Sequence, residues 1–170
     1  MMRHLTAKDF KKMPWANGKG TTVEVLRIER DGQLVLRLSR AMVIEDGPFS
    51  VFEGVERNLT VLSGSGFDLV GEGLRFSARP LVPVAFAGDI PLQAKGVAAP
   101  SEDFNVMTQR ALPRPEVWVQ QDGIIPPECM ALALESGTIG DVTVARHDLV
   151  MLDQAMAHDH SVIVVRAVLA

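Results

Sequence analysis

The chain has 170 residues, and its 17 lysines and arginines against 21 acidic residues give a net charge of −4. This length suits one compact domain, and the absence of a basic run argues against a nucleic-acid-binding surface. Because no run of 18 apolar residues occurs and residues 1–12 lack the apolar core of a signal peptide, we expect a cytoplasmic protein without a membrane partner.

Short apolar runs rich in valine, leucine and isoleucine alternate with turn signals every eight to twelve residues, which predicts an all-β sandwich or barrel. Residues 6–12 could form one helical turn. Pro91, Gly96 and Pro100 restrict the linker 88–102 to a short edge strand. The predicted strands, in chain order, are 21–28, 33–43, 57–63, 66–70, 74–77, 81–86, 104–109, 116–120, 129–135, 138–145, 148–152 and 161–169.

The order of these strands predicts a single compact domain over residues 1–170. A rough internal duplication, with approximate halves 14–90 and 100–170, is compatible with the glycine-bounded hairpins in each half. The single cysteine, Cys129, lies in a run typical of a buried strand, so we interpret it as a small core residue.

The stretch PWANGKG, residues 14–20, resembles a phosphate-binding loop only superficially. Such a loop needs a glycine where Met13 stands, a hydroxyl side chain where Gly20 stands, and a helix after it. The β-branched residues that follow favour a strand instead. Trp15 as an apolar wall and Asn17 as a hydrogen-bonding group suit a small polar ligand, whereas a plug with a hairpin turn is the structural alternative.

Polar residues recur at alternate positions of two predicted strands. In 33–43, Arg37 and Ser39 share one face and the leucines share the other, so the polar face is either a barrel interior with a site or a solvated surface. Residues 103–107 place Asp103, Asn105 and Met107 on one face in the same way.

In a third predicted strand, Arg57 shares a face with Leu59 and Val61, so an arginine leads into an apolar face. Arg37 and Arg57 could pair with Asp46, Asp89 or Asp103, or they could hold a ligand carboxylate with paired hydrogen bonds.

Four blocks together resemble the HutD/Ves family of bacterial proteins. They are PWANGKGTTVEVLRI, LRLSRAMVIEDGPFSVFEGVERNLTVLSGSGFDL, PVAFAGDIPL and EDFNVMTQR, between Met13 and Arg110. The resemblance implies a double cupin, that is, an RmlC-like jelly-roll fold of two small β-barrels. It also implies that the PWxNGxG block lies at the mouth of the first barrel. Lys19 departs from the glycine that is usual in the family.

The resemblance further implies a protein of histidine utilisation that binds an acidic metabolite such as N-formylglutamate and modulates the pathway. Arg37 and Arg57 would then anchor a carboxylate. The full set of expected ligand-binding residues is Trp15, Asn17, Lys19, Arg37, Ser39, Phe49, Arg57, Asp103, Asn105 and Met107.

Cupin enzymes usually hold a metal on histidines, but no histidine lies between residues 5 and 146. We therefore expect no metal and no cofactor. A weaker alternative is a divalent ion on His158 and His160, which would share one face of an extended segment.

Three further interpretations stay open. One is a metal-independent enzyme, an isomerase or hydrolase with Asp103 or Glu45 as base, although the residues favour a binding protein over an enzyme. Another is a stress-related protein of the Ves branch. The third is an assembly role, in which the face carrying Leu34, Leu36 and Leu38 forms a homodimer.

Overall fold

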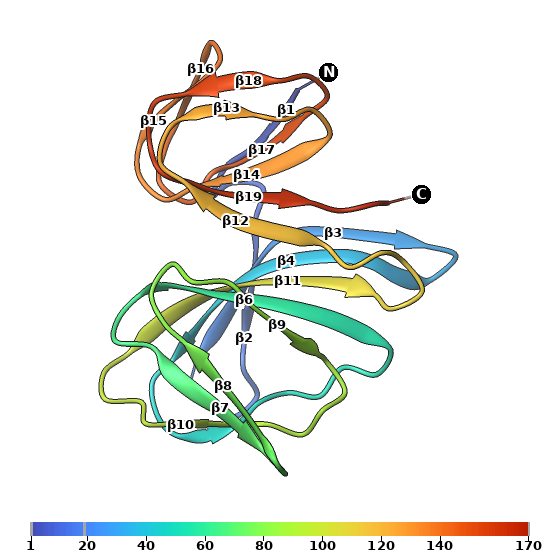
Figure 1. Cartoon of the computed structure of the whole chain (residues 1–170), viewed down its shortest axis with the longest axis vertical. Coiled ribbons are helices and arrows are strands. Elements are labelled where there is room, and N and C mark those ends of the chain that lie inside the picture. The colour runs from blue at the N-terminus through green and yellow to red at the C-terminus, as the bar shows by residue number, and fades with distance from the viewer. Residues whose placement is uncertain (1, 19, 170) are drawn as a thin grey trace. The chain divides into compact units, whose positions relative to one another are not determined.

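The computed structural model describes residues 2–18 and 20–169, and within these ranges it contains strands and no helix (Figure 1). None of the described residues therefore forms a helix that could cross a membrane. The strands divide into two compact units. One unit is Lys11–Arg114, and the other combines the chain up to Phe10 with Pro115–Val168.

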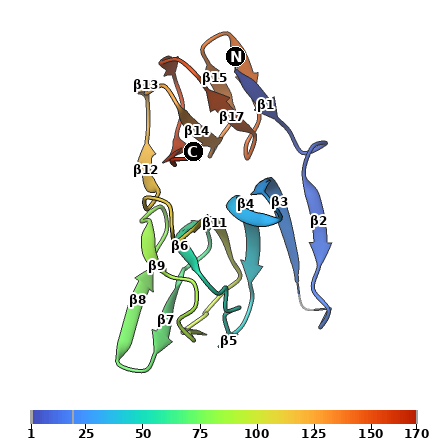
Figure 2. The ribbon, with the colours of Figure 1, turned by 90° about the vertical axis from the view of Figure 1, so that its right-hand side faces the viewer.

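The unit Lys11–Arg114 contains two sheets. In the six-stranded sheet the order is β2-β3-β4-β11-β6-β9, and in the four-stranded sheet it is β5-β10-β7-β8. Figure 2 shows β7 and β8 across the unit from β2 and β3. The ten strands are β2 (Lys11–Pro14), β3 (Thr21–Arg30), β4 (Gln33–Val43), β5 (Gly47–Pro48), β6 (Val55–Ser63), β7 (Phe67–Gly71), β8 (Leu74–Ala78), β9 (Val84–Ala87), β10 (Gln93–Lys95) and β11 (Ser101–Gln109).

The second unit also contains two sheets, with the orders β1-β17-β14-β19-β12 and β13-β18-β15-β16. The strands of this second unit are β1 (Arg3–Leu5), β12 (Glu116–Gln120), β13 (Gly123–Ile125), β14 (Cys129–Ala133), β15 (Gly137–Ile139), β16 (Val142–Val144), β17 (Leu149–Leu152), β18 (Met156–His158) and β19 (Val162–Arg166). The predicted all-β fold with two small barrels is thus confirmed.

Each unit has an apolar cluster of its own. In the first, residues such as Leu59, Phe67 and Leu69 form an apolar cluster that fills part of the space between the sheets. In the second, the inward side chains of β14, β17 and β19 form an apolar cluster that includes Cys129, as expected for a core cysteine. The buried polar groups that matter for a site in the first unit lie beside its apolar cluster, on β4, β6 and β11.

The boundary between the units lies later in the chain than the expected halves. Strand β11 pairs with both β4 and β6, so residues 101–109 belong to the first unit and not to the second. Strand β1 pairs with β17, which brings the amino-terminal residues into the second unit. Neither long-range pairing is visible in the local pattern. That the chain forms one compact domain stays a prediction.

Several local predictions were wrong. Residues 7–9 form a turn and not a helix, because Asp9 accepts a hydrogen bond from the Thr6 amide and returns its own amide to the Thr6 carbonyl. The predicted strand 138–145 is a hairpin of β15 and β16 around Gly140, which has a φ of 56°. Strand β10 in the linker is short, as expected, but it lies between β5 and β7 and not at an edge.

Strand 33–43 has the predicted bounds, and both of its faces carry buried residues, Val35 and Ser39 on one and Leu36 and Leu38 on the other. Leu36 and Leu38 are fully buried in a single copy of the chain. This leucine face therefore needs no second copy to cover it, and a homodimer stays a prediction.

Candidate functional site

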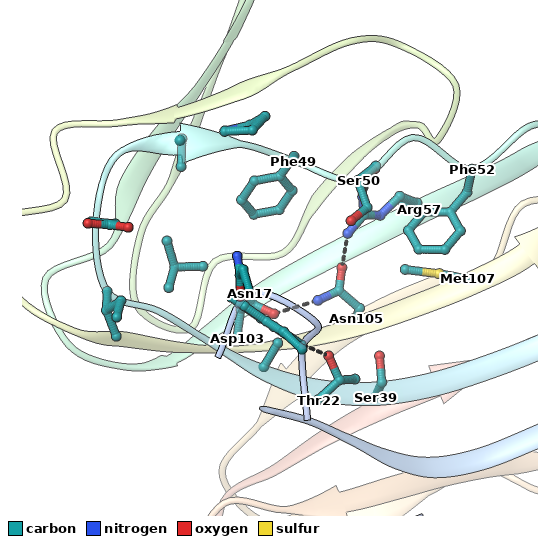
Figure 3. A pocket seen from close by; sticks show the side chains of 18 of the residues that line it. Asn17, Thr22, Ser39, Phe49, Ser50, Phe52, Arg57, Asp103, Asn105 and Met107 are labelled. Atoms are coloured by element: carbon teal, nitrogen blue, oxygen red, sulfur yellow. Dashed lines mark hydrogen bonds between the residues drawn. The ribbon is translucent and has the colours of Figure 1, made fainter. Parts of the chain in front are cut away.

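A cavity of about 600 Å³ opens into the interior of the first unit (Figure 3). Its walls come from β4, β6 and β11, from the loop before β3, and from the segment between β4 and β6. All of the predicted site residues except Lys19 line it, and Lys19 lies outside the described residues. The lining residues predicted from the sequence are Trp15, Asn17, Arg37, Ser39, Phe49, Arg57, Asp103, Asn105 and Met107.

Strand register explains why these side chains meet. Met107 of β11 stands opposite Arg37 of β4 and opposite Arg57 of β6, so one row across three strands carries two arginines. Asn105, which lies two residues before Met107 on β11, stands opposite Ser39 of β4. Because side chains at i and i+2 share a face of a strand, the polar positions fall on the cavity side together.

Arg57 is a buried cation held by neutral groups. Its side chain is only 5% exposed; Nη1 donates to the Ser50 carbonyl over 3.1 Å and Nη2 donates to Asn105 Oδ1 over 2.7 Å. The guanidinium carbon lies 5.1 to 5.4 Å from the ring centroids of three phenylalanines, Phe49, Phe52 and Phe86. Burial lowers the pKa of Arg57 to about 10, which still leaves it charged at neutral pH.

Asp103 lies at the other end of a short hydrogen-bonded chain. The Asn105 amide nitrogen donates to Asp103 Oδ1, while the Asn105 oxygen accepts from Arg57, as the dashed lines in Figure 3 show. Asp103 is 1% exposed. Burial raises the pKa of Asp103 to about 7, although the positive charge of Arg57 and the Asn105 hydrogen bond both act to lower it. The two charges thus interact through an intervening amide.

Arg37 has a different partner from those expected. Its Nε donates to Glu24 Oε2 over 2.7 Å, and not to Asp46, Asp89 or Asp103. Asp89 instead pairs with Arg110 over 2.7 Å. The alternative pairing of Arg37 with one of these aspartates was wrong because it ignored β3, on which Glu24 stands opposite Ser39, two residues from Arg37 on β4.

The opening loop is folded around Trp15. The Trp15 amide donates to the Gly20 carbonyl over 2.8 Å, and its indole N–H donates to Thr22 Oγ1 over 2.9 Å. A Cβ atom at Gly20 would lie only 2.8 Å from two ring carbons of Trp15. Glycine at this position therefore allows the indole to lie against the backbone and form one wall of the cavity.

Two residues that sequence reasoning missed complete the site. Phe52 packs its ring against the Arg57 guanidinium, and Ser50 gives the carbonyl that Arg57 binds. Both lie in the irregular segment between β5 and β6, where no strand period predicts the direction of a side chain. The pair of aromatic residues in PFSVF is the one available signal.

The histidines near the carboxyl end lie in the second unit. His158 and His160 are buried, with ring centroids 6.0 Å apart. The Nδ1 atom of His158 lies 2.8 Å from the His160 carbonyl oxygen, and that of His160 lies 3.0 Å from Asp159 Oδ1. Within residues 2–18 and 20–169, no group of three or more histidine, cysteine or acidic side chains is placed to hold a metal ion.

Sequence comparison decides the family. The HutD family model matches residues 7–161, which is most of the chain. This chain belongs to the HutD family. The resemblance seen in the residues between Met13 and Arg110 is confirmed, and the HutD match also covers most of the second unit.

Relatives of this HutD family member support the assignment. A protein of Pseudomonas putida, named as an uncharacterised 21.2 kDa protein in the hutC 3′ region, is 39% identical over 61% of this chain. Protein Ves of Cronobacter sakazakii is 36% identical over 65% of this chain. The alignments span 56% and 64% of the lengths of these two relatives, respectively. The chain thus spans less than two thirds of each.

Structural comparison gives the fold. The solved structure of HutD from Pseudomonas fluorescens SBW25, obtained in a formate condition, superimposes with a TM-score of 0.88 and covers 100% of both chains at 23% identity. The expected all-β cupin fold of the HutD family is therefore confirmed.

Proposed function

We propose that this protein binds a small acidic metabolite in the cavity of its first barrel, and that N-formylglutamate represents the class of acid. The observation that carries the proposal is Arg57. It lines the cavity as a buried guanidinium, and it donates hydrogen bonds to a backbone carbonyl and to an amide oxygen. Among the described residues, no carboxylate lies within ion-pair distance of it.

Other features of the cavity fit such a ligand. Its volume of about 600 Å³ lies in the range common for small-molecule sites. Arg37 uses one N–H on Glu24, and a guanidinium has five, so it could also contact a ligand carboxylate. Ser39 and Asn17 offer polar groups for an amide or formyl group, and Met107 and Phe49 offer apolar walls. The relative named for the hutC 3′ region agrees with a role in histidine utilisation.

Titration calorimetry tests this function. The panel contains N-formylglutamate, glutamate, formate, urocanate and neutral sugars. We expect an acid of the N-formylglutamate class to bind and the sugars not to bind. In Arg57→Gln the charge is lost and a shorter, neutral polar side chain remains, so affinity falls by about ten- to a hundredfold, since a hydrogen bond to a charged group contributes about 1.5 to 3 kcal/mol.

The matched control is Arg75→Gln. Arg75 lies on β8 with a side chain that is 69% exposed, and it pairs with Asp68 outside the cavity. Its replacement leaves affinity unchanged if the cavity is the site. Equal loss in both variants, or tight binding of the acid by Arg57→Gln, would count against a role for Arg57 in anchoring the ligand.

The pKa of about 7 for Asp103 in the cavity favours one second candidate, a metal-independent isomerase or hydrolase with Asp103 as general base. In that case Asp103→Asn abolishes turnover of a bound acid and retains binding. Ligand that is recovered unchanged after prolonged incubation with the wild-type protein would argue for binding alone.

A further inference from the structure

Asp103 is a cavity-lining carboxylate that the proposed binding function does not yet use. It is 1% exposed, and Asn105 separates it from the nearest cation. Because Asn105 donates its nitrogen to Asp103, its oxygen must face Arg57. Asp103 is therefore linked to the same guanidinium that would receive an anionic ligand.

The charged groups around Asp103 come from several elements. Arg57 on β6 and Arg37 on β4 line the same cavity, and Glu24 on β3 is paired with Arg37. The segment after β4 adds two acidic lining residues, Glu45 and Asp46. Next to Asp103 in the chain, Glu102 pairs with Arg40 over 3.0 Å. Of the two cations, Arg57 is the one whose charge favours an ionised Asp103.

An anion bound at Arg57 changes this balance. Its negative charge offsets the guanidinium charge that stabilises the Asp103 carboxylate, and it adds direct repulsion between like charges. It also displaces water from the cavity, which strengthens both effects because the local dielectric constant falls. The bound state therefore favours a neutral, protonated Asp103.

We propose that occupation of the cavity by an anion is coupled to the uptake of one proton by Asp103. The inference rests on the proposed function, because it requires an acidic ligand. It makes Asp103 a selectivity residue: a ligand that carries negative charge to Arg57 binds more weakly as the pH rises, whereas a neutral ligand does not. Asp103 would thus tie the occupancy of the site to the pH around it.

The composition of the first unit makes this coupling easy to assign. Burial places the pKa of Asp103 at about 7 in the unliganded protein, so the carboxyl titrates near neutral pH. Residues 11–114 contain no histidine and no cysteine. Ordinary aspartate, glutamate, lysine and arginine side chains do not titrate between about pH 6 and pH 9. Proton uptake in this window by the first unit therefore points to Asp103.

Titration calorimetry in two buffers of different ionisation enthalpy, phosphate and Tris, measures the coupled protons directly. The probe is N-formylglutamate, whose two carboxyl groups have ordinary pKa values below about 5 and whose amide does not titrate. At pH 8 we expect uptake of more than about half a proton per site. Affinity falls by up to about tenfold between pH 8 and pH 9.

Two variants identify the group that takes up the proton. Asp103→Asn keeps an oxygen for the Asn105 hydrogen bond and removes the titration, so proton uptake disappears and the pH dependence of affinity flattens. Asp46→Asn is the matched control: Asp46 also lines the cavity, but a hydrogen bond from the Val97 amide lowers its pKa, so it is already ionised. This control keeps the proton uptake of the wild type.

The outcomes separate the two proposals. Binding of the acid without proton uptake at pH 8, or equal uptake by Asp103→Asn, overturns the coupling and leaves the proposed function standing. No binding between pH 6 and pH 9 overturns both. If Asp103→Asn does not fold, the ¹³C shift of the Asp103 carboxyl in the wild type decides: its titration midpoint rises with ligand bound, and an unchanged midpoint overturns the inference.

Discussion

At the scale of single residues, the main feature is the guanidinium of Arg57, which is buried and forms no ion pair with any of the described residues. A buried charge is expensive unless other groups replace its hydration. Around Arg57 the replacement consists of two hydrogen bonds and the faces of three phenylalanines, Phe49, Phe52 and Phe86, at cation–π distance. Arg57 therefore keeps its charge inside the barrel, and that charge remains available to an incoming anion.

Asp103 leads to a prediction on stability. Its pKa is raised to about 7 in the folded state, above the ordinary value of an unfolded aspartate, so the folded state binds more protons between about pH 4 and pH 7. Asp103 therefore destabilises the fold increasingly as the pH rises through this window. Relative to the wild type, Asp103→Asn should gain about 2 to 3 kcal/mol in free energy of unfolding between pH 5 and pH 8.5.

Urea denaturation of both proteins at the two pH values measures this gain. Asp89→Asn is the control, because its hydrogen bond to Arg110 lowers the pKa of Asp89 to about 2 and the carboxylate stays ionised throughout. The control difference should be the same at both pH values. If the difference in free energy of unfolding between Asp103→Asn and the wild type is also the same at both pH values, burial does not raise the pKa of Asp103.

Much of this residue arrangement was predictable from strand alternation. Side chains two residues apart share a face of a strand, which put Arg37 with Ser39 and put Asp103 with Asn105 and Met107. Both of these faces line the cavity. The partner of Arg37 was not predictable. Glu24 reaches it because the pairing of β3 with β4 sets Glu24 opposite Ser39, and no local pattern encodes that long-range register.

At the scale of elements, residues 15–17 form a wall of the cavity that a hydrogen bond to β3 helps to hold in place. Its hydrogen bonds from Trp15 to Gly20 and Thr22 fix the indole at the cavity. The sequence alone left open whether this loop grips a ligand or plugs the barrel. In the structure Trp15 and Asn17 both line an open cavity, which suits the first interpretation, although ligand contact stays a prediction.

Gly20→Ala should displace that wall. The added methyl group would lie 2.8 Å from the indole, so the ring must shift. We expect weaker ligand binding and a changed emission spectrum of Trp15, measured by fluorescence in a Trp118→Phe background. Gly47→Ala is the control on the same cavity, because nothing lies within 4 Å of its new Cβ atom. An unchanged spectrum in Gly20→Ala would show that the indole is not packed against this backbone.

Some elements with a clear strand period were predicted with the right bounds, and most of the shortest strands were missed. Strands β4 and β12 have the predicted bounds, whereas β1, β2, β5, β10, β13 and β18 have at most four residues each and give almost no periodic signal. The failed helix at 6–12 has the same cause: seven residues carry too little pattern to distinguish a turn held by Asp9 from a helical turn.

At the scale of the whole molecule, the two barrels have different interiors. The first carries the cavity and its buried polar row, and the second contains an apolar cluster to which β13 to β17 and β19 contribute. The sequence indicated two sets of strands but placed residues 104–109 in the wrong one. The pairing of β11 between β4 and β6 corrects this, and it is what completes the site.

The most direct test of the central claim is a crystal structure of the protein with N-formylglutamate at saturating concentration. We predict the ligand inside the cavity of the first unit, with one carboxylate within about 3.2 Å of the guanidinium nitrogens of Arg57 or Arg37. A cavity that stays without ligand, or a ligand bound away from both arginines, would contradict the assignment of this cavity as an acid-binding site.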